Sequence, residues 1–120
     1  MVGVFILEAP ILLRGEGMEE AIRLGGNIEL AGFHVLDGGE MVVVKKIVGN
    51  YVRRMEGMCR NFSGLKLRLK PLHQTGELAK KFELHGQVID DGMVYPAGAI
   101  EHNVFVGVDS VLKKLVNEIS

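Results

Sequence analysis

Residues 40–62, EMVVVKKIVGNYVRRMEGMCRNF, carry apolar side chains at steps of three and four. This spacing predicts a long amphipathic α-helix with one buried stripe. The stripe consists of Val44, Val48, Tyr51, Val52, Met55, Cys59 and Phe62. Gly49 and Gly57 lie inside the pattern, and each costs up to about 1 kcal/mol relative to Ala. The helix therefore depends on packing against the rest of the protein.

A hairpin is the competing interpretation of this region. Ile28–Leu36 and Met41–Val48 have the length of two strands, and Asp37-Gly38-Gly39 between them is a turn sequence. In that arrangement the helix begins only near Asn50. We favour the longer helix, preceded by a short strand at Ile28–Phe33.

Three strands are expected after this helix. Residues 65–72 alternate Leu with Lys or Arg, so one strand face is apolar and the other cationic. Residues 80–89 alternate apolar with polar side chains and lead into Asp90-Asp91-Gly92, a hairpin turn. Residues 93–100 return as a strand, in which Pro96 indicates an edge position or a bulge.

The last element is a helix that begins after Asn103, a favourable N-cap residue. Both helices are apolar on one side, and each of the later strands has one polar face. The sequence therefore predicts an α+β fold, a two-layer sandwich in which a four-stranded sheet carries both helices on one face. Residues 28–119 form this β-α-β-β-β-α core, and residues 1–120 make a single domain.

Residues 1–26 are predicted to be a strand and helix extension of the core. Val2–Leu7 is an apolar run of strand length, and Met18–Leu24 carries two Glu residues where the first turn of a short helix would lie. The whole run Val2–Leu13 is too apolar to stay exposed to solvent without a partner. We expect it to pair within the fold or to support a homodimer through this N-terminal segment.

Composition narrows the class of protein. Apolar residues make up 48% of the 120, which disfavours disorder, and a single cysteine excludes a disulfide framework within the chain. No apolar run is long enough to span a membrane. The apolar start is interrupted by Glu8 and Pro10 and makes a poor signal peptide, so we expect a cytoplasmic protein.

Positive charge is concentrated in the middle of a chain whose formal net charge is −1. Residues 45–81 hold ten of the 14 Lys and Arg residues and two of the 15 Asp and Glu residues. Such a segment presents a local positive patch, although the protein lacks the overall basicity of a general nucleic-acid binder.

Two rows of cations are candidate RNA-binding sites, because phosphate contacts require Lys and Arg side chains. The first row, on the long helix with additions from the last helix, is Lys46, Arg53, Arg54, Arg60, Lys113 and Lys114. The second row, on one strand, is Lys66, Arg68 and Lys70. In a two-layer fold the rows lie on opposite sides. A solvated helix face is the ordinary interpretation of the first row.

The kind of RNA follows from the aromatic content. The chain has no Trp and two Tyr, so stacking platforms for single-stranded bases are scarce. Binding to structured RNA by shape is the better expectation.

Catalytic and metal sites are not expected. The four His residues have no close ligand spacing, and Cys59 lies on the apolar stripe, where it is a core residue rather than a nucleophile. No Gly-rich loop follows a strand in the pattern that binds phosphates, so no cofactor is predicted. We expect a protein that is not an enzyme.

Three stretches resemble the ribosome hibernation-promoting factor family, also called sigma-54 modulation or ribosome-associated inhibitor proteins. They are YVRRMEGMCRNF (51–62), GLKLRLKPL (64–72) and EHNVFVGVDSVLKKLVNEI (101–119). The resemblance covers about residues 28–119. It implies the β-α-β-β-β-α fold, binding of the small ribosomal subunit through basic surfaces, and regulation of translation in the stress response.

The chain also departs from that family. Residues 1–26 have no counterpart in its short members, the last helix offers only Lys113 and Lys114 as cations, and both ends of the chain are acidic. The alternative is therefore a non-enzymatic, self-associating protein that has the same fold without a ribosomal role.

Overall fold

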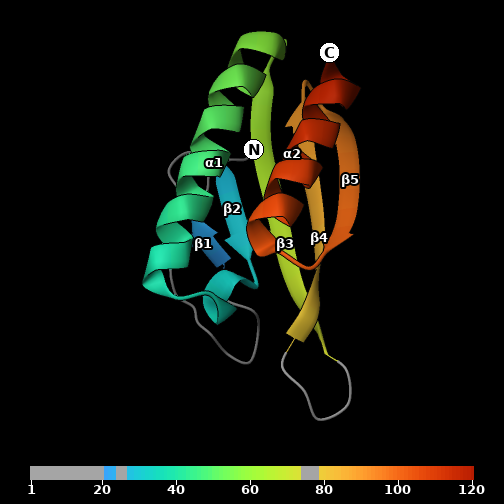
Figure 1. The fold of residues 1–120 in the computed structure, drawn as a ribbon. Coiled ribbons are helices and arrows are strands. Elements are labelled where there is room, and N and C mark those ends of the chain that lie inside the picture. Colours follow the sequence, from blue (N-terminus) through green and yellow to red (C-terminus); the bar gives the residue numbers. More distant parts are fainter. Residues whose placement is uncertain (1–20, 24–26, 74–78) are drawn as a thin grey trace.

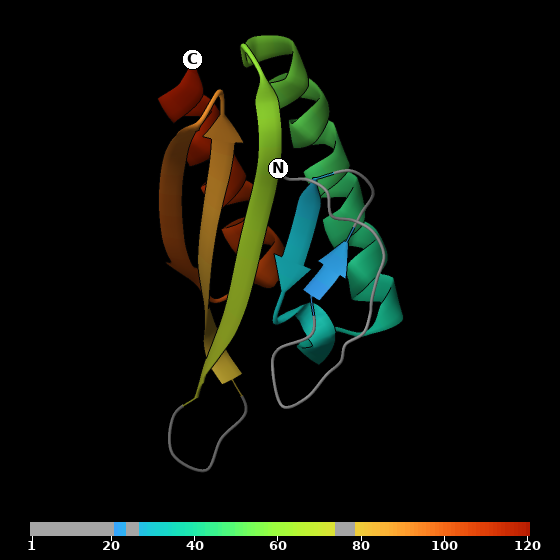
Figure 2. The ribbon, with the colours of Figure 1, turned by 180° about the vertical axis from the view of Figure 1, so that it is seen from behind.

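Two helices, α1 (Gly38–Met58) and α2 (Val104–Ile119), cover one face of a mixed sheet in the computed structural model (Figure 1). The structure describes residues 21–23, 27–73 and 79–120. Seen from behind, the sheet lies in front of both helices (Figure 2). The predicted two-layer α+β architecture is confirmed.

The sheet has the strand order β1-β2-β3-β4-β5. Its strands are β1 (Ala21–Arg23), β2 (Ile28–Ala31), β3 (Phe62–His73), β4 (Ala79–Asp90) and β5 (Met93–Glu101). β2 and β3 are parallel, and every other neighbouring pair is antiparallel. A parallel pair needs a crossover connection, which α1 supplies. The predicted β-α-β-β-β-α order is confirmed for β2 onward.

Asp37 begins α1 and decides between the two interpretations of this region. Its carboxylate accepts a hydrogen bond of 2.8 Å from the Glu40 N–H, and the Glu40 carboxylate accepts one of 2.9 Å from the Asp37 N–H. This capping box satisfies two backbone donors at the helix start. The alternative hairpin with a turn at Asp37-Gly38-Gly39 is wrong.

The end of α1 lies earlier than the apolar spacing predicts. The helix stops at Met58, Cys59 is already extended, and Phe62 begins β3 instead of closing the helix. The Asn61 N–H donates to the Asp90 carboxylate at 2.9 Å, and the Asp91 N–H donates to the Asn61 carbonyl at 2.9 Å. These bonds to the β4–β5 hairpin hold the chain in a non-helical path.

The helix predicted over Met18–Leu24 is wrong in the part that the structure describes. Ala21–Arg23 is β1, a short strand that pairs antiparallel with β2 and adds a fifth strand beside the predicted four. Backbone pairing at the edge of the sheet outweighs the weak helical signal of two acidic residues. The expected strand at Val2–Leu7 lies outside the described residues.

β2 ends at Ala31, two residues earlier than predicted, because the chain turns at Gly32. Gly32 has a φ of 81°, and a Cβ there would collide with the Leu69 carbonyl oxygen. Only glycine tolerates both conditions. A 3-10 turn, Phe33–Val35, follows and places the Phe33 ring in the core.

The core lies between the helices and the sheet. Its buried side chains are Leu30, Phe33, Val44, Val48, Val52, Met55, Leu65, Leu67, Leu69, Leu84, Val88, Val104, Val108, Val111, Leu112, Leu115 and Val116. Two glycines bring α2 close to the sheet. A Cβ on Gly107 would lie 2.5 Å from Leu84 Cδ1, and a Cβ on Gly86 would lie 2.7 Å from Val111 Cγ1.

Candidate nucleic-acid interface

The cations of β3 project from the face of the sheet that neither helix covers. Lys66, Arg68 and Lys70 are exposed, whereas Leu65, Leu67 and Leu69, which alternate with them, are at most 1% exposed. Residues two apart along a strand are separated by about 6.7 Å. The β3 row, Lys66, Arg68 and Lys70, therefore spans about 13 Å in a straight line.

Acidic residues flank the β3 row on both sides. Glu29 on β2 is opposite Lys66, and Glu83 on β4 is opposite Lys70. Glu83 also contacts His85 on its own strand, with 2.8 Å between Oε2 and Nε2. The open face is therefore a positive strip with negative borders.

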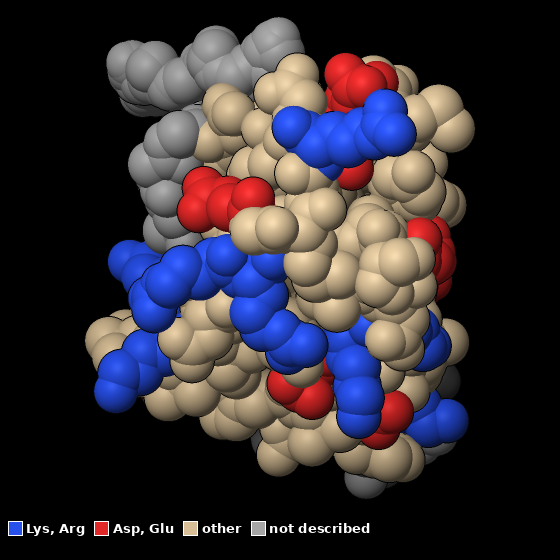
Figure 3. All heavy atoms as spheres, turned by 90° about the horizontal axis from the view of Figure 1, so that it is seen from above, with Lys and Arg blue, Asp and Glu red and all other residues tan. Residues whose placement is uncertain are grey.

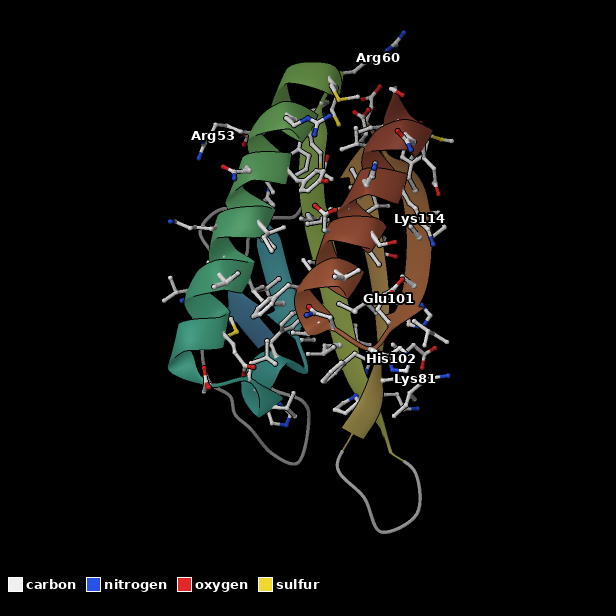
Figure 4. All side chains as sticks on the ribbon, viewed as in Figure 1. Arg53, Arg60, Lys81, Glu101, His102 and Lys114 are labelled. Carbon is white, nitrogen blue, oxygen red and sulfur yellow. The ribbon has the colours of Figure 1, made fainter. Side chains whose placement is uncertain are left out.

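The predicted helix row is not continuous. Lys46 and Arg53 are exposed on α1, and Arg53 points away from α2 (Figure 4). Arg60 lies beyond the end of α1, in the turn before β3. The prediction that Arg60 continues the helix face is wrong, because the helix ends at Met58.

Arg54 belongs to a cluster that joins the two helices. Its guanidinium lies over the Tyr51 ring, 5.4 Å from the centroid. The Tyr51 hydroxyl donates a hydrogen bond of 2.8 Å to Asp109 on α2. Burial, followed by this hydrogen bond, raises the pKa of Tyr51, so the phenol stays a donor at neutral pH. Arg54 therefore has a packing role within the protein.

The two lysines of α2 diverge. Lys114 turns to the sheet edge, where its Nζ donates a hydrogen bond of 2.7 Å to the Gly98 carbonyl of β5 (Figure 4). Lys113 is exposed and lies four residues after Asp109, on the same side of α2. The expectation that both lysines extend the α1 row is wrong for Lys114.

Figure 3 shows how the charges are distributed on the molecule seen from above. Lys and Arg side chains gather mainly on the side of α1, and Asp and Glu side chains lie between them. The surface seen in this view therefore carries charges of both signs, which is typical of a solvated surface. Two further exposed cations, Lys45 and Lys81, were not among the predicted site residues. Strand alternation identifies Lys81, because it lies two residues before Glu83 on the same face of β4.

Aromatic side chains pack toward the core. Phe62, Phe82 and Tyr95 lie against it, and Phe33 is fully buried within it. The outward positions of β2, β3, β4 and β5 carry no Phe, Tyr or Trp in the described part of the chain, and His85 supplies their one aromatic ring. A row of large aromatic rings on which successive single-stranded bases could stack is therefore missing from these outward positions.

Cys59 sits where α1 meets the β4–β5 hairpin. Burial, followed by the neighbouring Asp90 carboxylate, raises its pKa to about 11. The group is a protonated thiol at neutral pH, whereas a nucleophile requires the thiolate. Across residues 21–23, 27–73 and 79–120, no three His, Cys, Asp or Glu side chains are grouped as metal ligands.

No known protein-family model matches the chain, and no curated protein matches it. The resemblance to the ribosome hibernation-promoting factor family therefore stays a prediction. Neither α1 nor α2 has the length and apolarity to cross a bilayer.

Proposed function

We propose that this protein binds structured RNA through phosphate contacts on the open face of its sheet. The observation that carries the proposal is the β3 row, in which Lys66, Arg68 and Lys70 project from one strand away from both helices. Cations fixed at regular spacing on a rigid strand displace the counterions of RNA phosphates, which makes binding favourable and dependent on salt.

The rigidity of the sheet suits the recognition of RNA by the shape of its backbone. The β3 row lies on the central strand of the sheet, with hydrogen-bonded neighbours on both sides, so the backbone that carries it is rigid. Without Phe, Tyr or Trp on the described outward positions, the face contacts the RNA backbone rather than the bases. A duplex or folded RNA is the matching partner.

The small ribosomal subunit is the RNA partner that the three family-like stretches favour. In that role the protein would act in the cytoplasm and regulate translation under stress. Binding would use phosphate contacts alone, without a cofactor or a catalytic step. Glu29 and Glu83 on the neighbouring strands would repel phosphates and so limit RNA contact to the β3 row itself.

Co-sedimentation with small ribosomal subunits at low and moderate salt tests the function. We expect the wild type to sediment with the subunits at low salt and to dissociate as salt rises. Lys66→Glu with Arg68→Glu should abolish this binding, because two cations of the β3 row are reversed. Arg53→Glu with Arg60→Glu is the matched control on the helix side and should bind normally. Loss of binding only in the control pair would move the site to the surface around Arg53 and Arg60.

Self-association without a ribosomal role is the second candidate function. Exposed apolar side chains on β5, at Met93, Val94 and Ile100, favour it. A wild type that binds neither subunits nor duplex RNA at low salt would leave this candidate as the better one.

A further inference from the structure

β5 is an edge strand of the sheet in the part of the chain that the structure describes, and the turn before it fixes which of its backbone groups point away from β4. Asp91 and Gly92 form the two-residue loop before it, with φ of 52° and 84°. Positive φ at both positions is typical of a type I′ hairpin, whose closing pair exchanges both hydrogen bonds. That pair is Asp90 and Met93. The N–H and C=O groups that point away from β4 therefore belong to Val94, Gly98 and Ile100, together with the carbonyl of Pro96.

Two other observations agree that the backbone groups of these residues point away from β4. The Gly98 carbonyl accepts the 2.7 Å hydrogen bond from Lys114 of α2, as expected for a carbonyl that points away from β4. Pro96 has no N–H, and proline is tolerated in a strand where its nitrogen faces outward. The β4–β5 register also runs without a bulge past Pro96.

The side chains of this edge are apolar and exposed. Val94 is 51% exposed, Ile100 is 55% exposed and Met93 is 59% exposed. The only charged residue of β5 is Glu101, at its end. A nine-residue edge strand with this composition is a template for the addition of another strand.

We propose that β5 pairs antiparallel with β5 of a second copy of this chain, with the two-fold axis at Ala97. In this register Val94 lies opposite Ile100 of the partner subunit, and the two exposed apolar side chains cover each other. These residues also exchange both of their outward hydrogen bonds. The symmetry repeats the arrangement on the other side of the axis.

Pro96 and Lys114 fit this register. Gly98 lies opposite Pro96 of the partner subunit, and the Gly98 N–H donates to the carbonyl of that proline. The proline has no N–H to return to the Gly98 carbonyl. Lys114 already donates to this carbonyl, so the one group that the partner strand cannot satisfy is satisfied within the chain. Lys114 reaches it from α2, on the helix-covered side of the sheet (Figure 4).

Neighbouring registers fit less well. An axis at Pro96 places the two prolines opposite each other, so two carbonyls lose their donors. An axis at Gly98 places Pro96 opposite Ile100 of the partner subunit, which leaves the Ile100 carbonyl without a donor. Only the axis at Ala97 aligns Val94 with Ile100 and matches the proline with the carbonyl that Lys114 serves.

Sedimentation equilibrium of the full chain tests the pairing, which is independent of RNA binding. The wild type should form a reversible dimer, and Val94→Lys or Ile100→Glu alone should weaken it by at least about tenfold. An equimolar mixture of these two variants should recover the dimer, because the introduced Lys then faces the introduced Glu. Both substitutions are at exposed positions, and circular dichroism should show that each variant folds.

Disulfide trapping tests the register itself, in a Cys59→Ser background. Ala97→Cys should cross-link two copies on oxidation, because residues on the axis have Cα atoms about 4.5 Å apart. Ala99→Cys is the matched control on the same face of β5. Its two copies would lie about 13 Å apart and should not cross-link.

Several results would overturn the pairing. A wild type that stays monomeric up to about 1 mM lacks this interface, since weaker association falls short of a specific contact. A dimer that neither Val94→Lys nor Ile100→Glu weakens uses another surface. Equal cross-linking of both cysteine variants, or a monomer that accepts only an unrelated extended peptide at β5, would also contradict it.

Discussion

Tyr51 of α1 donates a hydrogen bond of 2.8 Å to Asp109 of α2, which links the two helices above the sheet. Tyr51→Phe removes this donor and keeps the ring. We expect a loss of about 0.5–1.5 kcal/mol in the free energy of unfolding, measured by urea denaturation. Asp109→Asn keeps an acceptor oxygen and should cost less. An unchanged midpoint in Tyr51→Phe would show that the bond does not stabilise the fold.

Leu67 and Val108 test the core between β3 and α2. Leu67 is 1% exposed and Val108 is fully buried. Leu67→Ala should destabilise by about 2–4 kcal/mol and Val108→Ala by less, because each leaves a cavity in proportion to the atoms removed. Equilibrium unfolding in urea measures both. Wild-type midpoints in the two variants would refute their placement in the core.

Gly107 and Gly49 are a matched pair of glycines in helices. A Cβ at Gly107 would lie 2.5 Å from Leu84 Cδ1, whereas a Cβ at Gly49 would meet no atom within 4 Å. Gly49→Ala should stabilise the protein by up to about 1 kcal/mol through helix propensity. Gly107→Ala should destabilise by about 1–3 kcal/mol, because either the buried Leu84 side chain or α2 must shift to make room for the added methyl group. Thermal unfolding compares the two, and equal shifts would contradict the close approach of α2.

The Cys59 thiol should show a distinct pH dependence. Its pKa is raised to about 11 from an ordinary value of 9.0, first by burial and then by Asp90. The folded state therefore keeps the proton where the unfolded state loses it. The resulting stabilisation is complete below about pH 9 and is lost as the pH rises through the folded pKa.

Alkylation with iodoacetamide measures this pKa directly. The rate for Cys59 should be slow at pH 8 and should rise until about pH 11, because only the thiolate reacts. Asp90→Asn removes the neighbouring charge and should shift the profile to lower pH. A profile centred near the ordinary value in the wild type would show that Cys59 is not held as a thiol by its surroundings.

The parts of the fold that follow from local pattern could be predicted from the sequence. Alternation of Leu65, Leu67 and Leu69 with cations identified β3 and both of its faces, since strand side chains have a period of two. Asn103 marked the start of α2, and its side chain accepts from the N–H groups of Phe105 and Val106. Asp37 with Glu40 three residues later is a capping-box signature that could have excluded the hairpin.

The parts that depend on distant contacts could not be predicted in this way. The apolar spacing of α1 continues to Phe62, but Asn61 is held by Asp90 and Asp91, which lie 29 and 30 residues further along the chain. β1 exists because it pairs with β2, and three residues carry little strand signal of their own. The direction of Lys114 depends on how α2 packs against the sheet. The sequence alone therefore does not reveal that this side chain reaches β5.

The salt dependence of RNA binding should show how many cations of the β3 row contact phosphates. Removing one cation that binds a phosphate reduces the slope of log K against log salt by about 0.9 on a duplex. Lys66→Gln and Lys70→Gln should each lower the slope by about that amount, and together by about twice as much. Arg53→Gln on α1 is the matched control and should leave the slope unchanged. Fluorescence anisotropy with a labelled RNA hairpin, titrated at several salt concentrations, gives these slopes. An unchanged slope in the double variant would contradict phosphate recognition by the β3 row. Tighter binding of a single strand than of the hairpin would contradict the preference for structured RNA.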